Sequence, residues 1–302
     1  MQICSLLPSA TEILYALQLG DSVAGVTHEC DFPPDAAKKP VLIRPRVDST
    51  APLAELDRQV NELVARGESI YAVDAELLAN LAPDLIVTQD LCHACAASPG
   101  DLATALTRLP KHPRVLSLSP HSLADVWQDI CRVGEATRTS TEAEALAAKL
   151  AARVATIQSL TANASKRPRV VCLEWLDPFY VGGHWVPEMV VNAGGEDVLG
   201  RAGERSFRVT PEQIEHSDPD VIMVMQCGFA AERNAADFRA RGLLETWRSL
   251  SAVRERRVYA VDANSYFSRP GPRLADGVEL LAHIFHPDLF LLRIPTSTLC
   301  RL

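Results

Sequence analysis

The chain has 302 residues, of which 47% are hydrophobic and 23% are charged, a composition typical of a globular protein long enough for two domains. Its 30 Lys and Arg stand against 38 Asp and Glu, and the net charge of −8 makes binding to nucleic acid or to an anionic membrane surface unexpected. No apolar run reaches the roughly 18 to 20 residues that span a bilayer, so we expect no insertion into a membrane.

The first half of the chain alternates predicted strands and helices. Met1–Pro8 has neither the basic start nor the long apolar run of a secretory leader, which favours a cytoplasmic protein, and it contains a predicted strand at 3–7. Ser9 and Glu12 form a Ser-x-x-Glu capping box that predicts a helix start, and Gly20 is expected to end that helix. Further strands are predicted at 23–26 and 85–88, and helices near 52–66 and 75–81. This order predicts an α/β domain with a mainly parallel sheet, whose ligands gather at the carboxyl ends of the strands.

The same order of segments recurs in the second half. Gly20–Gly25 has a counterpart in Gly195–Gly200, and the first strand has one in Val170–Trp175. Three further residues repeat at a constant offset of 136 positions, namely Glu76, Pro83 and Asp84 with Glu212, Pro219 and Asp220. The recurrence predicts two lobes that are built alike, with a cleft between them.

An Ala-rich segment lies between the two halves. Thr141–Asn163 has apolar residues at three- and four-residue spacing and a Thr141-x-x-Glu144 capping box, and Pro168 follows it. As a helix it would be roughly 35 Å long, enough to join two lobes as a rigid connector. An ordinary surface helix of the first lobe is the alternative. We therefore expect an N-terminal lobe at 1–138, a connecting helix at 139–167 and a C-terminal lobe at 168–302.

Four segments together carry a resemblance to a known family. Ser5–Leu14, the strand entry Ala82–Ile86, the central helix and Tyr266–Arg273 resemble the cobalamin-binding members of the helical-backbone (class III) substrate-binding proteins, the receptors of ABC importers for corrinoids and iron chelates. The resemblance extends to about Pro287 and is greatest to a leaderless, cytoplasmic subgroup. It implies two Rossmann-like lobes joined by one long helix, a corrinoid held in the cleft, and no catalysis. It also implies one glutamate on each lobe for docking to a permease, at Glu76 and Glu212.

A corrinoid needs apolar and aromatic walls, polar partners for its amide side chains, and an imidazole where a cobalt ligand is required. Candidates for all three follow the predicted strands. As a set they favour a flat, partly apolar ligand, although each aromatic residue alone is equally explained as lobe core. For cobalt, His28 is the first candidate and His184 is its rival, and each is also explained as an ordinary loop histidine. The expected contacts are Pro8, Ser9, His28, Glu29, Asp90, Leu91, Glu174, Trp175, His184, Trp185, Phe229, Tyr266, Phe267, Ser268 and Arg269.

The cysteines suggest a second function. Cys30, Cys92, Cys95 and Cys227 follow predicted strands in both halves, and four thiolates that converge would suit zinc or an iron–sulfur cluster. The alternative is that these thiols line a pocket or the core. Three others, Cys4, Cys131 and Cys172, lie in apolar patterns and are predicted to be core residues.

The leading hypothesis is therefore non-enzymatic binding of cobalamin or another corrinoid in the interlobe cleft of a cytoplasmic protein. A thiolate-bound metal or iron–sulfur protein, with redox activity, is the alternative. Both predict a small-molecule ligand and no nucleic-acid partner. Docking to a permease through Glu76 and Glu212 is an expectation of the resemblance.

Overall fold

A computed structural model of the chain describes residues 1–48, 50–89, 105–107, 109, 111–290 and 297–302. Its contacts divide the chain into two compact units. Unit 1 comprises Met1–Pro120 and Gln128–Ala147, and unit 2 comprises His121–Trp127 and Ala148–Leu302. None of the described helices has both the length and the apolar character to cross a bilayer.

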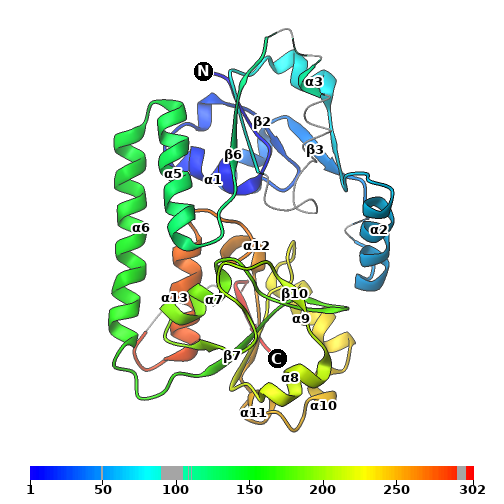
Figure 1. Cartoon of the computed structure of the whole chain (residues 1–302), viewed down its shortest axis with the longest axis vertical. Coiled ribbons are helices and arrows are strands. Elements are labelled where there is room, and N and C mark those ends of the chain that lie inside the picture. The colour runs from blue at the N-terminus through cyan, green and yellow to red at the C-terminus, as the bar shows by residue number, and fades with distance from the viewer. Residues whose placement is uncertain (49, 90–104, 108, 110, 291–296) are drawn as a thin grey trace. The chain divides into compact units, whose positions relative to one another are not determined.

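Unit 1 is built around a six-stranded sheet in the order β4-β3-β2-β1-β5-β6 (Figure 1). All neighbours are parallel except β3 and β4. The strands are β1 (Ile3–Ser5), β2 (Val23–Thr27), β3 (Val41–Pro45), β4 (Tyr71–Val73), β5 (Leu85–Gln89) and β6 (Arg114–Leu118). The helices of this part are α1 (Pro8–Ala16), α2 (Leu53–Ala65) and α3 (Ala75–Leu81), with 3₁₀ turns at Gly20–Ser22 and Ala36–Lys38. The predicted order of strands and helices is confirmed, with shifts of one to a few residues at their ends.

The central strand of unit 1 is fully buried, as a parallel strand covered on both faces should be. Ile3 and Cys4 have no exposed surface, and Cys4 packs with Leu42, Leu78 and Ile86. Burial raises the pKa of the Cys4 thiol to about 12, so the thiol stays neutral and acts as an apolar group. This confirms the core role predicted for Cys4.

The start of α1 differs from its prediction. Leu7 is the N-cap residue and Pro8 occupies the first turn, so Ser9 lies inside the helix with no capping bond to Glu12. Proline is well suited to this position because its fixed φ is already helical and its missing N–H would have no helical partner. The capping box predicted at Ser9 is therefore wrong, because the proline one residue earlier begins the helix.

Unit 2 contains a seven-stranded sheet in the order β10-β8-β7-β11-β12-β13, with β9 also paired to β7. Strands β9, β7, β11 and β12 are mutually parallel, and the pairs β7–β8, β8–β10 and β12–β13 are antiparallel. The strands are β7 (Arg169–Leu176), β8 (Phe179–Val181), β9 (Glu196–Asp197), β10 (Phe207–Arg208), β11 (Val221–Val224), β12 (Val258–Val261) and β13 (Leu299–Arg301). The helices are α7 (Val186–Asn192), α8 (Pro211–Ser217), α9 (Ala231–Ala240), α10 (Leu243–Thr246), α11 (Ser251–Arg254), α12 (Ala263–Tyr266) and α13 (Leu274–Phe285).

The internal repeat is visible in matching hydrogen bonds. In unit 1 the backbone N–H of Gln2 donates to Asp84 Oδ2 at 2.9 Å, and in unit 2 that of Arg169 donates to Asp220 Oδ2 at 2.9 Å. Each aspartate thus ties the entry of one central strand to the entry of its neighbour. The helices before them also match, because the C-cap residues Ala82 of α3 and Asp218 of α8 both adopt the left-handed conformation. The two units are therefore built alike at these positions, as the sequence predicts.

Two helices contain residues of both units. They are α5 (Leu123–Thr137) and α6 (Ser140–Thr161), and the division falls within each of them. The 22-residue α6 closely matches the helix predicted at 141–163, but Thr141 is its second residue and not a cap. In unit 2, Arg153 of α6 donates to Asp276 at 2.6 Å and to Glu279 at 2.8 Å, both on α13. The domain boundaries expected from the sequence remain a prediction.

Candidate functional site

In unit 2, aromatic side chains line up across the ends of three strands. Trp175 and Tyr180 are register partners on the antiparallel strands β7 and β8, so their side chains share one face of the sheet. Phe229, beyond the end of β11, stacks on Trp175 with ring centroids 5.8 Å apart and planes at 23°. We call Tyr180, Trp175 and Phe229 the aromatic row. All three are half-buried, so each keeps surface that a ligand can contact.

Polar groups border the aromatic row. Trp175 donates from its indole N–H to the carbonyl of Asp177 at 3.0 Å, which fixes the ring. Glu174 accepts a hydrogen bond from the Ser206 hydroxyl, and the guanidinium of Arg208 lies 6.0 Å from the centre of the Tyr180 ring. The neighbouring Arg201 pairs with Glu204 at 3.3 Å. The row therefore combines a flat apolar surface with hydrogen-bonding groups at its margin, the usual composition of a small-molecule site.

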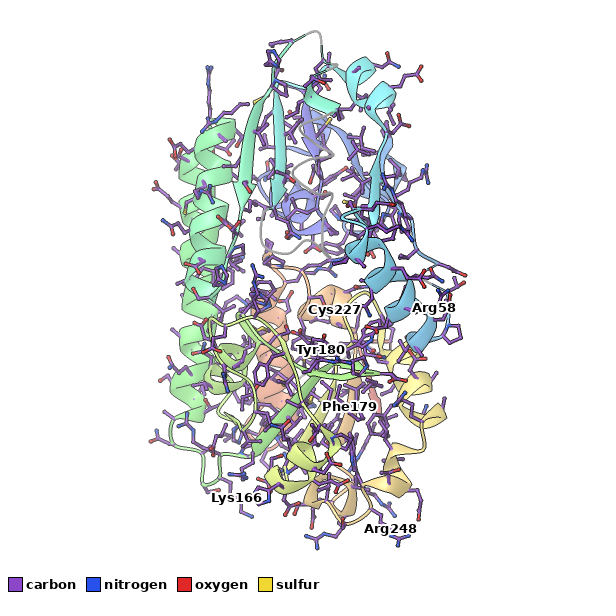
Figure 2. All side chains as sticks on the ribbon, turned by 45° about the vertical axis from the view of Figure 1, so that its right-hand side comes forward. Arg58, Lys166, Phe179, Tyr180, Cys227 and Arg248 are labelled. Atoms are coloured by element: carbon purple, nitrogen blue, oxygen red, sulfur yellow. The ribbon has the colours of Figure 1, made fainter. Side chains whose placement is uncertain are left out.

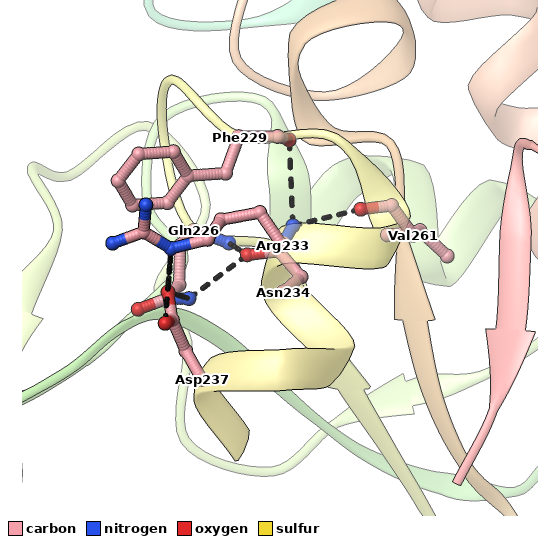
Figure 3. A network of polar contacts seen from close by, with 6 residues as sticks. All are labelled: Gln226, Phe229, Arg233, Asn234, Asp237 and Val261. Atoms are coloured by element: carbon pink, nitrogen blue, oxygen red, sulfur yellow. Dashed lines mark hydrogen bonds and ion pairs between the residues drawn. The ribbon is translucent and has the colours of Figure 1, made fainter. Parts of the chain in front are cut away.

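A buried polar network lies behind Phe229 (Figure 3). Gln226 and Asn234 have no exposed surface, and the amide of Gln226 donates to Asn234 Oδ1 at 3.0 Å. Arg233 donates to both oxygens of Asp237, at 2.9 and 2.8 Å, and its guanidinium lies 4.8 Å from the centre of the Phe229 ring. No motif in the sequence indicated this network. The only signal was the four-residue spacing of Arg233 and Asp237, typical of an ion pair on a helix.

Two expected ligand contacts, Trp185 and Phe267, lie in the interior of unit 2, and a third, His184, is half-buried. Trp185 is 5% exposed and Phe267 is 2% exposed, and the Trp185 indole N–H donates to the Phe267 carbonyl at 2.7 Å. His184 adopts φ +51°, a conformation uncommon for a residue with a side chain. Its ring lies 5.7 Å from that of His121, and its Nε2 is buried without a hydrogen-bond partner among the described residues. As placed, Trp185 and Phe267 offer almost no surface to a ligand.

The environment of His184 keeps its imidazole neutral. Burial lowers the pKa of His184, and the nearby His121 and Arg205 lower it further. The rest of the predicted set in this region is mixed. Tyr266 and Ser268 are half-buried, whereas Arg269 is 9% exposed. The contact roles of this set remain a prediction.

In unit 1, the expected residues follow β1 and β2. Pro8 is half-buried and Ser9 is 2% exposed, both in the first turn of α1. His28 Nδ1 lies 3.1 Å from the carbonyl of Ile43 and, because a carbonyl only accepts, Nδ1 is the donor. The other ring nitrogen, Nε2, lies 4.0 Å from Glu29 Oε1. A carbonyl that orients an imidazole in this way is common where the other nitrogen binds a metal.

The structure describes two of the four cysteines expected to bind metal. Cys30 is 3% exposed, and its Sγ lies 3.0 Å from Thr11 Oγ1 and 3.3 Å from Thr27 Oγ1. Cys227 is exposed at the end of β11 (Figure 2). Among the described residues, no group of three or more His, Cys, Asp or Glu side chains could hold a metal ion. Cys92 and Cys95, like Asp90 and Leu91, lie outside the described residues, so the zinc or iron–sulfur site stays a prediction.

The two glutamates expected to dock to a permease occupy matching places. Glu76 is in the first turn of α3, whose N-cap Asp74 accepts from Leu77 N at 2.9 Å. Glu212 is in the first turn of α8, whose N-cap is Thr210. Both glutamates are exposed. A carboxylate near a helix N-terminus is favoured by the helix dipole, and the hydrogen bond with the Thr210 side chain lowers the pKa of Glu212.

A surface hollow of about 440 Å³ lies elsewhere on unit 2. It is lined by α6 and the segment after it, at Ala155, Gln158, Ser159, Ala162 and Arg167. It contains none of the expected contacts and no aromatic side chain. We therefore place the candidate site at the aromatic row.

Comparisons with known proteins agree with the two-lobe α/β fold. The model of a family described as periplasmic binding protein matches residues 3–265, which include strands of both units. An uncharacterized ABC transporter substrate-binding lipoprotein of Bacillus subtilis (strain 168), YvrC, is 30% identical over 96% of this chain and 81% of its own length. The vitamin B12-binding protein of Vibrio cholerae is 24% identical over 92% of this chain and 86% of its own length.

Solved structures share the fold. The periplasmic heme-binding protein RhuT from Roseiflexus sp. RS-1 superposes with a TM-score of 0.70 and 25% identity, over 95% of this chain and 98% of that chain. The match extends over both units, so the order of strands and helices is common to the two proteins from end to end.

Proposed function

Because the chain belongs to the periplasmic binding protein family, we propose that it binds a corrinoid through the aromatic row of unit 2. Members of this family bind substrates for ABC transport and are not enzymes, so no catalytic residue is assigned. The observation that carries the proposal is the stacked, half-exposed pair of Trp175 and Phe229. A flat aromatic surface of this kind suits the face of a planar macrocycle.

The polar margin supports a ligand with many hydrogen-bonding groups. Glu174 and Ser206 are held together next to Trp175, and Arg208 lies beside Tyr180. The amide side chains of a corrinoid both donate and accept hydrogen bonds, so carboxylate, hydroxyl and guanidinium groups are all suitable partners. The vitamin B12-binding protein of Vibrio cholerae, similar over most of this chain, supports the same ligand class.

The expectation that His28 of unit 1 is a cobalt ligand remains a prediction. Its Nδ1–H donates to the Ile43 carbonyl, an arrangement that is common where the other ring nitrogen binds a metal. Haem is the second candidate ligand, because it is also planar, takes an imidazole ligand, and is bound by the structurally similar RhuT. A cytoplasmic location remains a prediction, which cell fractionation tests.

Titration of the purified protein separates these ligands. Hydroxocobalamin and haemin are each added while binding is measured by calorimetry and by absorbance, and coordination of a histidine changes the visible bands. We expect hydroxocobalamin to bind and Trp175→Ala to weaken it by roughly 30-fold or more, the effect of removing a central aromatic anchor. Trp175→Phe retains a ring and should lose much less.

Two outcomes would contradict the proposal. Tight binding of haemin with no binding of hydroxocobalamin would assign the site to haem. Equal affinities of wild type and Trp175→Ala for hydroxocobalamin would remove the aromatic row from the site.

A further inference from the structure

We infer that Arg233 and Asn234 are positioning residues that hold the Phe229 ring against Trp175 before a ligand arrives. The inference rests on the proposed function in that the aromatic row is taken as the ligand contact. Neither residue belongs to the row itself. Both lie on α9, directly after the loop that carries Phe229.

The loop between β11 and α9 is six residues long, 225–230, and Gly228 within it has φ +88°, a conformation that residues with side chains rarely adopt. Its backbone is held by Cys227 N, which donates to the Glu174 carbonyl at 3.3 Å, and by Phe229 N, which donates to the Gln226 carbonyl at 3.2 Å. Met225 and Gln226 are fully buried, whereas Cys227 and Gly228 are exposed. Phe229 therefore depends on contacts from neighbouring elements for its position.

Asn234 fixes the backbone of this loop at both ends. Its Nδ2 donates to the carbonyls of Val261, at 2.8 Å, and Phe229, at 3.4 Å (Figure 3). Its Oδ1 accepts from the backbone N–H of Gln226 at 3.2 Å and from the Gln226 side chain at 3.0 Å. The orientation of the amide is determined, because carbonyl oxygens can only accept. One buried side chain thus ties the loop to α9 and to the end of β12.

Arg233 fixes the ring. Its guanidinium contacts the Phe229 ring at 4.8 Å, a cation–π arrangement. Asp237 accepts from Arg233 Nε with both oxygens and also accepts from Gln226 Nε2 at 3.3 Å. The arginine is therefore held over the ring by a carboxylate that is itself bonded to the loop. Side chains of α9 therefore hold the Phe229 ring and help to hold its backbone, whose carbonyl also accepts from Ala263 N at 3.2 Å.

The network retains one feature that is unfavourable for stability. Gln226 Oε1 is buried without a hydrogen-bond partner among the described residues, because Nε2 must face the two acceptors Asn234 and Asp237. Local arrangements that sacrifice a buried hydrogen bond are expected where function requires a fixed geometry. In this network the part with a fixed position is the Phe229 ring. A ring that is already ordered loses less conformational entropy when a ligand binds to it.

Arg233→Met tests the inference, because it removes the charge and the bonds to Asp237 but keeps an apolar stem of similar length. Arg248→Met is the matched control: Arg248 pairs with Glu245 and lies at the opposite end of unit 2 from Cys227 (Figure 2). Near-ultraviolet circular dichroism without ligand reports the Trp175 ring, after the signal of Trp175→Phe is subtracted. Calorimetry reports affinity for hydroxocobalamin, and thermal unfolding shows that each variant is folded.

Arg233→Met should change the near-ultraviolet circular dichroism of Trp175 and weaken hydroxocobalamin binding by roughly 3- to 10-fold. Arg248→Met should leave both the Trp175 signal and the affinity as in wild type. Arg233→Lys keeps the charge without the planar fork and should recover part of both effects. A folded Arg233→Met with the wild-type Trp175 signal would overturn the inference. If wild type does not bind hydroxocobalamin, the proposed function fails, and the ligand-free Trp175 signal still decides whether Arg233 positions the ring.

Discussion

Asp197 is the carboxylate whose pKa is most strongly raised among the described residues. Its Oδ1 accepts from Leu199 N at 3.1 Å and from Gly200 N at 2.6 Å, whereas its Oδ2 is buried without a partner in the described part of the chain. Burial raises the pKa of Asp197 to about 6, although the two backbone donors oppose this. A carboxyl with a raised pKa binds its proton more tightly in the folded protein than in the unfolded chain. Stability is therefore lost as pH rises from about 4 to about 6.

Asp197→Asn should remove this loss. The amide keeps an acceptor for the two backbone donors and never ionises, so the variant should be more stable than wild type at pH 7.5 by about 1 to 3 kcal/mol and nearly equal at pH 4. Urea unfolding at several pH values measures the difference. The exposed Asp288→Asn is the control and should follow wild type. If Asp197→Asn retains the wild-type pH slope, another group causes it.

At the scale of single residues, the sequence predicted which cysteines are core residues better than it predicted which aromatic side chains are exposed. The apolar patterns around Cys4 and Cys172 indicated core positions, and both are fully buried. Trp185 and Phe267 were expected at the surface of the site because they follow strands, but their mutual hydrogen bond and packing place them inside unit 2. A pattern of residue types along the chain does not determine which of two neighbouring aromatic side chains, Trp175 or Trp185, faces outward. The fold decides that.

At the scale of the element, α8 offers a test of capping. Thr210 Oγ1 accepts from Gln213 N at 3.3 Å, and Gln213 Oε1 accepts from Thr210 N at 2.8 Å, which completes a capping box. Thr210→Ala should destabilise the protein by about 1 kcal/mol because the Gln213 N–H loses its side-chain acceptor at the helix end. Thr210→Ser keeps the hydroxyl and should recover most of the loss. Denaturant unfolding measures both, and an unchanged midpoint in Thr210→Ala would contradict the capping role.

Helices with a regular apolar spacing over many residues were predicted well. The residue at which a helix begins was predicted poorly, because a single residue determines it. The 22 residues of α6 and the seven of α3 were found because their apolar spacing is regular. The helix starts at Ser9 and Thr141 were misplaced, because any Ser or Thr followed by Glu three residues later satisfies the motif. The short strands β9 and β10 and the antiparallel β8 were not predicted, since pairs and triplets of residues carry too little pattern.

At the scale of the whole molecule, the repeat is the part of the fold that the sequence predicted most fully. It rests on side chains with a defined structural task, such as Asp84 and Asp220, which hold the entries of the central strands. The aromatic row was predicted only in part, because its assembly joins strands far apart in the chain and depends on a network on α9 that has no recognisable motif. Two equivalent helices then present Glu76 and Glu212, one in each unit.

We predict that these two glutamates dock the protein to an ABC permease. Both are exposed in the first turn of a helix, so neither contributes to a core and their replacement should leave folding and ligand affinity unchanged. The double variant Glu76→Ala, Glu212→Ala should lower corrinoid uptake by cells at least about tenfold, because each carboxylate would lose a charged partner in the complex. The exposed pair Glu144→Ala, Glu215→Ala is the matched control, with the same change in charge. Labelled cobalamin measures uptake, and wild-type uptake by the first double variant would show that the matching glutamates have no part in docking.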